Sequence, residues 1–208
     1  MPNKLIKVAL IGNTNAGKST FINFLLGDNV QKTGIAPTDD GFTILAYSEI
    51  PEDSTGPAAT KRPEITFTHL DRYGPAFLSR LKLKLLANPT LKTMTLVDSP
   101  GMIDAAGTGQ ERGYDFMAAV RSFGESADLI LFFLDPEKPG TTGEAIEAFT
   151  KALHCMESKT LILMNKADTF GNIRDFARDY GALCWNLSRV IKTKDLPDIY
   201  TTYIPLPE

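Results

Sequence analysis

Short apolar runs alternate with longer amphipathic stretches along this sequence. The apolar runs predict strands at 4–11, 42–48, 93–97, 129–134, 160–164 and 199–204. Two stretches between them, 116–123 and 173–191, repeat an apolar residue every three or four positions, as one face of a helix does. Strands that alternate with helices are typical of an α/β fold, in which helices cover both faces of a mostly parallel sheet. We therefore expect that architecture.

Two segments of the first half are less regular. Residues 51–63 contain three prolines and one glycine but no large apolar side chain, which predicts an exposed loop within the domain. Residues 75–87 alternate like a strand, yet Phe77, Leu81 and Leu85 also suit one face of a helix. We favour a helix for this segment, ended by the proline that follows Asn88.

Composition narrows the class of protein. The 208 residues predict one domain that spans residues 1–208, with 43% hydrophobic and 23% charged residues, as in ordinary globular chains. The net charge of −3 argues against a nucleic-acid partner, because binding to the phosphate backbone requires a basic face. Cys155 and Cys184 are the only cysteines, so a disulfide framework is not expected. His69 and His154 have no metal-ligand spacing around them.

The chain also lacks the patterns of export and of membrane insertion. The apolar run near the N-terminus is too short for a signal peptide, and the run at 129–134 is far too short to cross a bilayer. We therefore expect a cytoplasmic protein.

The strongest motif follows the first predicted strand. It matches the phosphate-binding pattern G-x-x-x-x-G-K-[ST] and leads into a predicted helix. Its residues are Gly12, Asn13, Thr14, Asn15, Ala16, Gly17, Lys18 and Ser19, and Thr20 follows them. In such a loop the backbone N–H groups surround the phosphates, the lysine contacts the β and γ phosphates, and the serine hydroxyl binds Mg²⁺. These residues are our candidate nucleotide site.

A second motif, Asp98-Ser99-Pro100-Gly101, ends another predicted strand. The pattern D-x-x-G is weak by itself, since it also occurs at 71–74 and 104–107. Only Asp98 ends an apolar strand, where its carboxylate can hold the Mg²⁺ shell and the Gly101 N–H can contact the γ-phosphate.

A third motif, Asn165-Lys166-Ala167-Asp168, follows the strand at 160–164. A carboxylate at Asp168 can accept hydrogen bonds from the N1–H and 2-amino groups of guanine. Adenine offers no such pair of donors, so this residue favours GTP.

With three motifs in this order, the chain resembles the P-loop GTPases, and its details resemble the dynamin superfamily. The likeness is to EH-domain-containing proteins and sarcalumenin, and it extends over nearly the whole chain. The segments that carry it are 88–102, 111–116, 128–136, 165–168 and 180–187.

Several positions depart from that family. In the first switch, Pro37-Thr38-Asp39-Asp40 has an aspartate where the family has a second threonine, so Thr38 is our candidate Mg²⁺ ligand. The family often has serine where Asn15 stands, and Met102 replaces the glutamine that orients water in Ras-like enzymes. No Ser-Ala-Lys motif follows to hold the base. Trp185 could border the base or could be a partly exposed packing residue.

The resemblance implies a Mg²⁺-dependent nucleoside triphosphatase that binds GTP. Lys18, Thr38, Asp98 and Gly101 would be its catalytic residues, and Ser19, Thr38 and Asp98 would hold the metal. The resemblance also leaves ATP open, because EH-domain proteins use ATP although they contain the Asn-Lys-x-Asp motif. Nucleotide state would control formation of a homodimer or larger oligomer. Membrane remodelling would depend on segments outside this chain, and the full-length protein would be peripheral to the membrane. The alternative is a nucleotide-gated scaffold that hydrolyses little.

Overall fold

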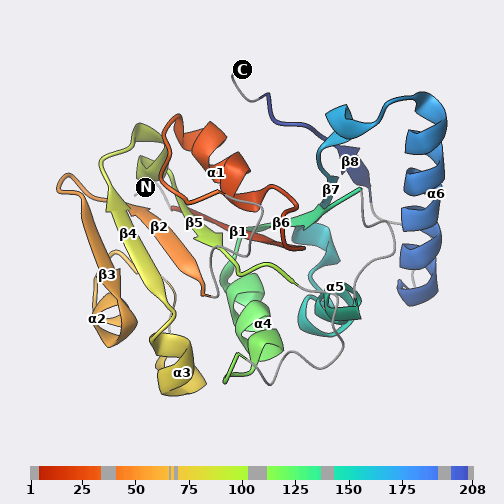
Figure 1. Cartoon of the computed structure of the whole chain (residues 1–208). Coiled ribbons are helices and arrows are strands. Elements are labelled where there is room, and N and C mark those ends of the chain that lie inside the picture. Colours follow the sequence, from red (N-terminus) through yellow and green to blue (C-terminus); the bar gives the residue numbers. More distant parts are fainter. Residues whose placement is uncertain are drawn as a thin grey trace.

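The computed structural model describes residues 5–33, 41–65, 67, 70–102, 112–136, 143–191 and 198–205. Eight strands among them form one sheet in the order β3-β4-β2-β5-β1-β6-β7-β8 (Figure 1). Their bounds are β1 (Ile6–Gly12), β2 (Thr43–Tyr47), β3 (Glu52–Thr55), β4 (Lys82–Leu86), β5 (Met94–Asp98), β6 (Leu129–Leu134), β7 (Thr160–Met164) and β8 (Ile199–Thr201). Neighbouring strands are parallel except in the pairs β2–β5 and β3–β4.

Helices cover both faces of this sheet. The α-helices are α1 (Lys18–Leu26), α2 (Gly56–Thr60), α3 (Gly74–Leu78), α4 (Phe116–Ser126), α5 (Gly143–Glu147) and α6 (Ile173–Val190). Shorter helical turns are η1 (Leu70–Tyr73), η2 (Pro89–Lys92), η4 (Ala148–Ala152), η5 (Glu157–Lys159) and η6 (Ala167–Thr169). Figure 1 shows α1 on one face and α4 and α5 on the other. The prediction of an α/β fold with a mostly parallel sheet is confirmed.

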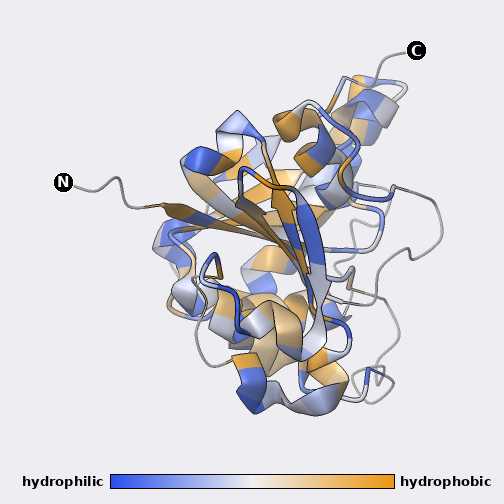
Figure 2. Ribbon diagram, turned by 90° about the vertical axis from the view of Figure 1, so that its left-hand side faces the viewer, coloured by the Kyte–Doolittle hydropathy of each residue, from blue (hydrophilic) through white to orange (hydrophobic). Residues whose placement is uncertain are grey.

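Side chains along the central strands point alternately to the two faces of the sheet, and a hydrophobic core lies on each face. In β1, Leu10 packs on the α1 side with Ile22, whereas Ile11 packs on the opposite side with Phe42 and Phe123. Figure 2 shows that the central strands are mostly hydrophobic. Burial on both faces explains why these strands are continuous apolar runs in the sequence.

The prediction of a helix for residues 75–87 is wrong. Only its start is helical, in α3, and Lys82–Leu86 forms strand β4, parallel to β2. Leu81, Leu83 and Leu85 are each at most 1% exposed, whereas the side chains of Lys82 and Lys84 lie on the more open face. The alternation with a period of two was therefore the correct signal, because the segment has a strand partner on each side.

The prediction of a loop for residues 51–63 is also wrong, because most of the segment has regular secondary structure. Glu52–Thr55 forms the edge strand β3, antiparallel to β4, and Gly56–Thr60 forms helix α2. The segment is largely exposed, as expected, and β3 is the hydrophilic strand at the front of Figure 2. An edge strand with polar side chains has no hydrophobic periodicity, and backbone pairing with β4 alone identifies it.

The register of the parallel strands brings the three motifs to one edge of the sheet. Leu10 is opposite Asp98 in β5, Gly12 is opposite Phe133 in β6, and Met164 of β7 is opposite Leu134. The loops that follow β1, β5 and β7 therefore leave the sheet at the same edge. In open α/β sheets ligands bind at this carboxyl edge. No helix in the described part of the chain is long and apolar enough to cross a membrane.

Candidate functional site

The loop between β1 and α1 requires glycine at two positions. A Cβ at Gly12 would lie 2.1 Å from the carbonyl oxygen of Phe133. A Cβ at Gly17, where φ is 93°, would lie 2.3 Å from the amide nitrogen of Asn165. No side chain caps the start of α1. The first N–H groups of a helix have no partner within it, so they are available to an anion such as phosphate.

Lys18 is the first residue of α1, and its ammonium group is buried. Its Nζ donates to the carbonyl oxygens of Gly12 at 3.0 Å and Asn13 at 2.9 Å. Burial lowers the pKa of Lys18 from 10.5 to about 8; the charge of Asp98 opposes this change, and that of Arg112 adds to it. Neutral carbonyls are weaker partners for a cation than phosphate oxygens. The lysine is therefore poised to exchange its present partners for an anion.

A hydroxyl and a carboxylate face each other beside Lys18. Ser19 Oγ donates to Asp98 Oδ2 at 2.9 Å, and the buried Gln31 Nε2 donates to the same oxygen at 2.8 Å. Mg²⁺ prefers oxygen ligands and is usually bound by one or two side chains together with substrate phosphates. Among the described residues no group of three His, Cys, Asp or Glu could hold a metal alone. The pair of Ser19 and Asp98 fits a Mg²⁺ ion shared with a nucleotide.

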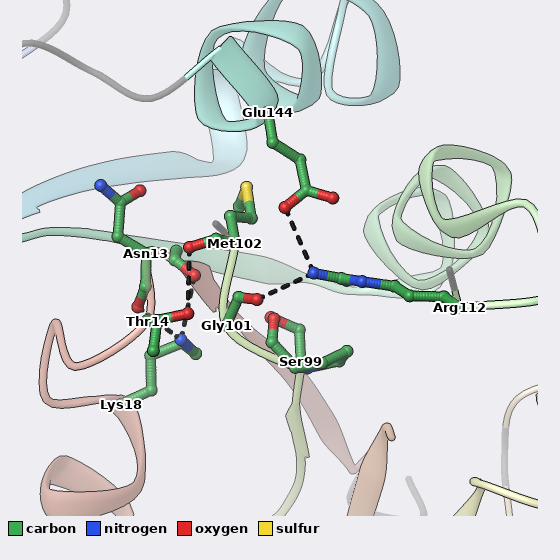
Figure 3. A network of polar contacts seen from close by, with 10 residues as sticks. Asn13, Thr14, Lys18, Ser99, Gly101, Met102, Arg112 and Glu144 are labelled. Atoms are coloured by element: carbon green, nitrogen blue, oxygen red, sulfur yellow. Dashed lines mark hydrogen bonds and ion pairs between the residues drawn. The ribbon is translucent and has the colours of Figure 1, made fainter. Parts of the chain in front are cut away.

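The segment after Asp98 docks directly on the phosphate loop (Figure 3). Met102 N donates to Gly12 O at 3.1 Å, and Met102 O accepts from Thr14 N at 2.9 Å and from Thr14 Oγ1 at 3.1 Å. A Cβ at Gly101 would lie 2.5 Å from Thr14 Oγ1, so only glycine permits this approach. The Met102 side chain is 1% exposed and belongs to the core. Met102 thus joins two motifs through its backbone.

A buried arginine holds the same segment from the other side. Arg112 Nη2 donates to Gly101 O at 2.9 Å and pairs with Glu144 Oε2 at 3.2 Å (Figure 3). The guanidinium carbon lies 3.9 Å from the centroid of the Phe116 ring, and Arg80 donates to the Arg112 carbonyl. The Gly101 peptide is therefore fixed by Arg112 through its oxygen, while the Met102 N–H is fixed by Gly12.

The turn that contains the third motif is tied to the phosphate loop and to β8. Asn165 Nδ2 donates to Ala16 O at 2.9 Å, and its Oδ1 accepts from Thr202 Oγ1 at 3.2 Å. Lys166 adopts a φ of 61° and pairs with Asp135 at 2.9 Å. Asp168 stands in η6 with its side chain exposed. The carboxylate is therefore open to a ligand, while the turn that carries it is rigidly held.

Other predicted site residues have different outcomes. Thr38 lies outside the described residues. Asn15 is exposed with φ of 63°, and Thr20 lies in α1 behind Ser19. Trp185 is 68% exposed and lies twelve residues into α6, about 18 Å along the helix axis from its start. The structure does not bring Trp185 to the turn that carries Asp168.

The structure adds three residues that the motifs did not reveal. Gln31 contacts Asp98, Arg112 contacts Gly101, and Thr202 contacts Asn165. Gln31 follows α1 in a polar stretch, and Thr202 follows a short strand, so neither stands in a recognisable pattern. Only one feature of the sequence pointed to Arg112: it lies inside segment 111–116, which resembles a known family.

Comparison with known proteins agrees with this geometry. The model of the dynamin family matches residues 8–167. The chain is 33% identical over 195 residues to EH domain-containing protein 3 of Homo sapiens, and 34% identical to EH domain-containing protein 2 of Rattus norvegicus. Each alignment covers 93% of this chain and 36% of the relative. The chain thus spans about a third of the length of the curated relatives it matches.

Solved structures show the same fold at low sequence identity. An oligomerised bacterial dynamin pair, described as sensing and tethering membranes, has a TM-score of 0.66 at 16% identity, over 97% of this chain and 34% of that one. Era of Aquifex aeolicus, bound to GDP and aluminium fluoride, has a TM-score of 0.55 at 17% identity, over 96% and 51% of the chains.

The sheet, the phosphate loop and the turn after β7 define a P-loop GTPase domain. The chain belongs to the dynamin family, and it is similar to the GTPase domain of the EH domain-containing proteins.

Proposed function

We propose that this chain binds and hydrolyses GTP in a Mg²⁺-dependent reaction, and that its nucleotide state controls self-association. One observation carries the proposal: Lys18, the pair Ser19 and Asp98, and the Gly101 segment meet at the start of α1. The Asn165 turn is hydrogen-bonded to the same loop. A triphosphate on the loop would therefore lie between a cation, a metal-binding pair and a base-binding turn.

The nucleotide would displace contacts that these residues make now. Lys18 would leave two backbone carbonyls for the β and γ phosphates, where it stabilises negative charge. Ser19 and Asp98, with Thr38 as a candidate third residue, would hold Mg²⁺. When bound there, the ion would supply positive charge that offsets the charge on the phosphates during in-line attack by water. The Gly101 N–H would contact the γ-phosphate, and Arg112 keeps this segment in place.

Guanine is the base favoured by the chemistry of Asp168. Its exposed carboxylate accepts hydrogen bonds and cannot donate them, which suits the two adjacent donors on guanine. Adenine would leave the carboxylate without these donors. ATP is the alternative that the notable likeness to EH-domain proteins keeps open, and direct comparison of the two nucleotides decides between them.

A second candidate function is a nucleotide-gated scaffold that hydrolyses little. The burial of Met102 favours it, because the residue after Gly101 offers no polar group to orient water. Hydrolysis would then depend on groups supplied when two copies associate. In a longer protein, association of this domain would serve membrane remodelling; the bacterial dynamin pair with a similar fold is described as sensing and tethering membranes.

Single-turnover hydrolysis of GTP with and without Mg²⁺ tests the proposal. The parent protein should bind GTP and release phosphate only when Mg²⁺ is present. Lys18→Ala should lose tight triphosphate binding but keep its circular dichroism spectrum, because the side chain contacts the loop rather than the core. Undiminished GTP affinity in folded Lys18→Ala would overturn the assignment of this loop. Tight binding without phosphate release would favour the scaffold.

A further inference from the structure

A buried amide lies next to the pair of residues that fit Mg²⁺. Gln31 is 5% exposed, and its Nε2 donates to Asp98 Oδ2 at 2.8 Å. A carboxylate oxygen cannot donate a hydrogen bond, so the contact fixes which amide atom faces Asp98. The amide oxygen Oε1 is bonded to the same carbon, Cδ, as the nitrogen that contacts Asp98. The Gln31 amide therefore lies next to the candidate metal site, with its nitrogen toward Asp98.

The Oε1 atom is buried and receives no hydrogen bond from any residue that the structure describes. A buried amide oxygen without a donor is costly, and such atoms normally have a partner. A hydrated Mg²⁺ ion carries water molecules that donate hydrogen bonds, and it usually keeps several of them when it binds a protein. A water of the ion's shell is therefore a donor that could satisfy Oε1.

The backbone of Gln31 is fixed independently of the metal. Asn23, on α1, donates from Nδ2 to Gln31 O at 2.8 Å and accepts at Oδ1 from Gln31 N at 2.8 Å. The same helix begins with Lys18 and Ser19. Gln31 is therefore held in register with the phosphate loop, although it follows the helix in sequence.

We propose that Gln31 is a positioning residue of the Mg²⁺ site: its Nε2 orients the Asp98 carboxylate, and its Oε1 accepts a hydrogen bond from a metal-bound water. The inference rests on the proposed function, because the ion arrives with the nucleotide. Residues that orient the ligands of a metal typically change metal affinity about 10- to 100-fold when they are replaced. Gln31 should therefore act on Mg²⁺ more than on the nucleotide itself.

The test measures Mg²⁺ affinity of the complex with a fluorescent GDP analogue, from the rate of nucleotide release as Mg²⁺ is titrated. Gln31→Met keeps the size of the side chain but removes both polar atoms, so it should lower Mg²⁺ affinity at least about tenfold. Its affinity for the nucleotide in excess EDTA should equal that of the parent, which also shows that the variant is folded. Asn29→Ala, which removes an exposed amide from the same loop, is the matched control and should change neither affinity.

A second variant separates the two contacts of Gln31. Gln31→Glu keeps an acceptor oxygen but puts a carboxylate oxygen against Asp98 in place of the Nε2 donor, so it should also bind Mg²⁺ less tightly than the parent, through loss of the Asp98 contact alone. Parental Mg²⁺ affinity in Gln31→Met or in Gln31→Glu would overturn the role of Gln31 and leave the proposed function standing. A parent protein whose nucleotide release does not respond to Mg²⁺ would overturn both.

Discussion

Lys18 is charged and buried at once, and this has a consequence for the pH dependence of binding. Burial lowers the pKa of Lys18 to about 8 in the nucleotide-free chain. Phosphate oxygens beside the ammonium favour its charged form, so binding raises the pKa again. Below pH 8 the lysine is already protonated and binding requires no proton. Above pH 8 each binding event must take up a proton.

We therefore expect the affinity for the triphosphate to be constant up to about pH 8 and to fall about tenfold for each further pH unit. Calorimetric titrations at pH 7, 8 and 9 measure it. Lys18→Arg keeps a positive charge that does not titrate in this range. This variant should bind the triphosphate more weakly than the parent, and residue 18 should no longer make the affinity depend on pH. Equal affinity of the parent at pH 7 and pH 9 would contradict a lowered pKa at Lys18.

At this scale the sequence revealed residues in fixed motifs but not those that support them. Lys18, Ser19 and Asp98 could be named because their spacing is set by the phosphates and the metal. Gln31 and Thr202 contact Asp98 and Asn165 only because the fold brings distant segments together. Such contacts have no local pattern, and they require the structure.

The elements around the turn that carries Asp168 form a connected unit. The segment after β8 binds the turn through two backbone hydrogen bonds, Thr202 N to Met164 O at 2.9 Å and Ala167 N to Thr202 O at 3.0 Å. The Thr202 hydroxyl adds the bond to Asn165, which in turn reaches Ala16 of the phosphate loop. The end of β8 therefore supports both the turn that carries Asp168 and the phosphate loop.

Thr202→Val should weaken nucleotide binding by about 0.5–1.5 kcal/mol without changing the preference for a base. The substitution removes one hydroxyl and leaves both backbone bonds and Asp168 in place. Thr201→Val, on an exposed neighbour, is the matched control for the change in strand composition. Calorimetric titration with GTP and ATP compares the variants. Equal affinities for the two valine variants would show that the hydroxyl does not support the turn.

Elements with strong apolar patterns were predicted well, and those with mixed patterns were not. The central strands β1, β5, β6 and β7 are buried on both faces and stand out as apolar runs. Strand β4 carries lysines between its leucines and is short, so the leucines also fit a helix. Strand β3 is polar and pairs with β4 at the edge of the sheet, so its segment has no apolar periodicity that could reveal it.

At the scale of the whole molecule, the proposed hydrolysis site has an apolar residue, Met102, directly after Gly101. Met102 is buried, so an isolated monomer has no side chain there to orient water. An unassisted GTPase domain of this kind turns over on the order of 10⁻⁴ to 10⁻² s⁻¹. In our proposal a second copy orders the segments around Thr38 and Asp98 across the nucleotide face. The group that orients the attacking water would then be supplied when two copies associate.

Turnover per molecule should therefore rise with protein concentration. The rise should be steeper when a transition-state mimic such as GDP with aluminium fluoride stabilises the dimer. Rate measurements over a wide concentration range and light scattering of the mimic complex give the two readouts. A constant specific rate together with a monomeric mass would refute activation by association and favour the slow scaffold.

The central claim is that this chain is a GTP-binding domain whose base is selected by Asp168, and calorimetric comparison of nucleotides tests it most directly. With Mg²⁺ present, GTP should bind at least about tenfold more tightly than ATP, a difference of about 1.4 kcal/mol. Asp168→Asn should weaken GTP and raise the relative affinity for xanthosine triphosphate, because an amide can donate to the extra carbonyl of xanthine. Asp175→Asn, which changes a carboxylate in the first turn of α6, should leave the preference unchanged. Binding of ATP at least ten times tighter than GTP by the parent protein would contradict the account.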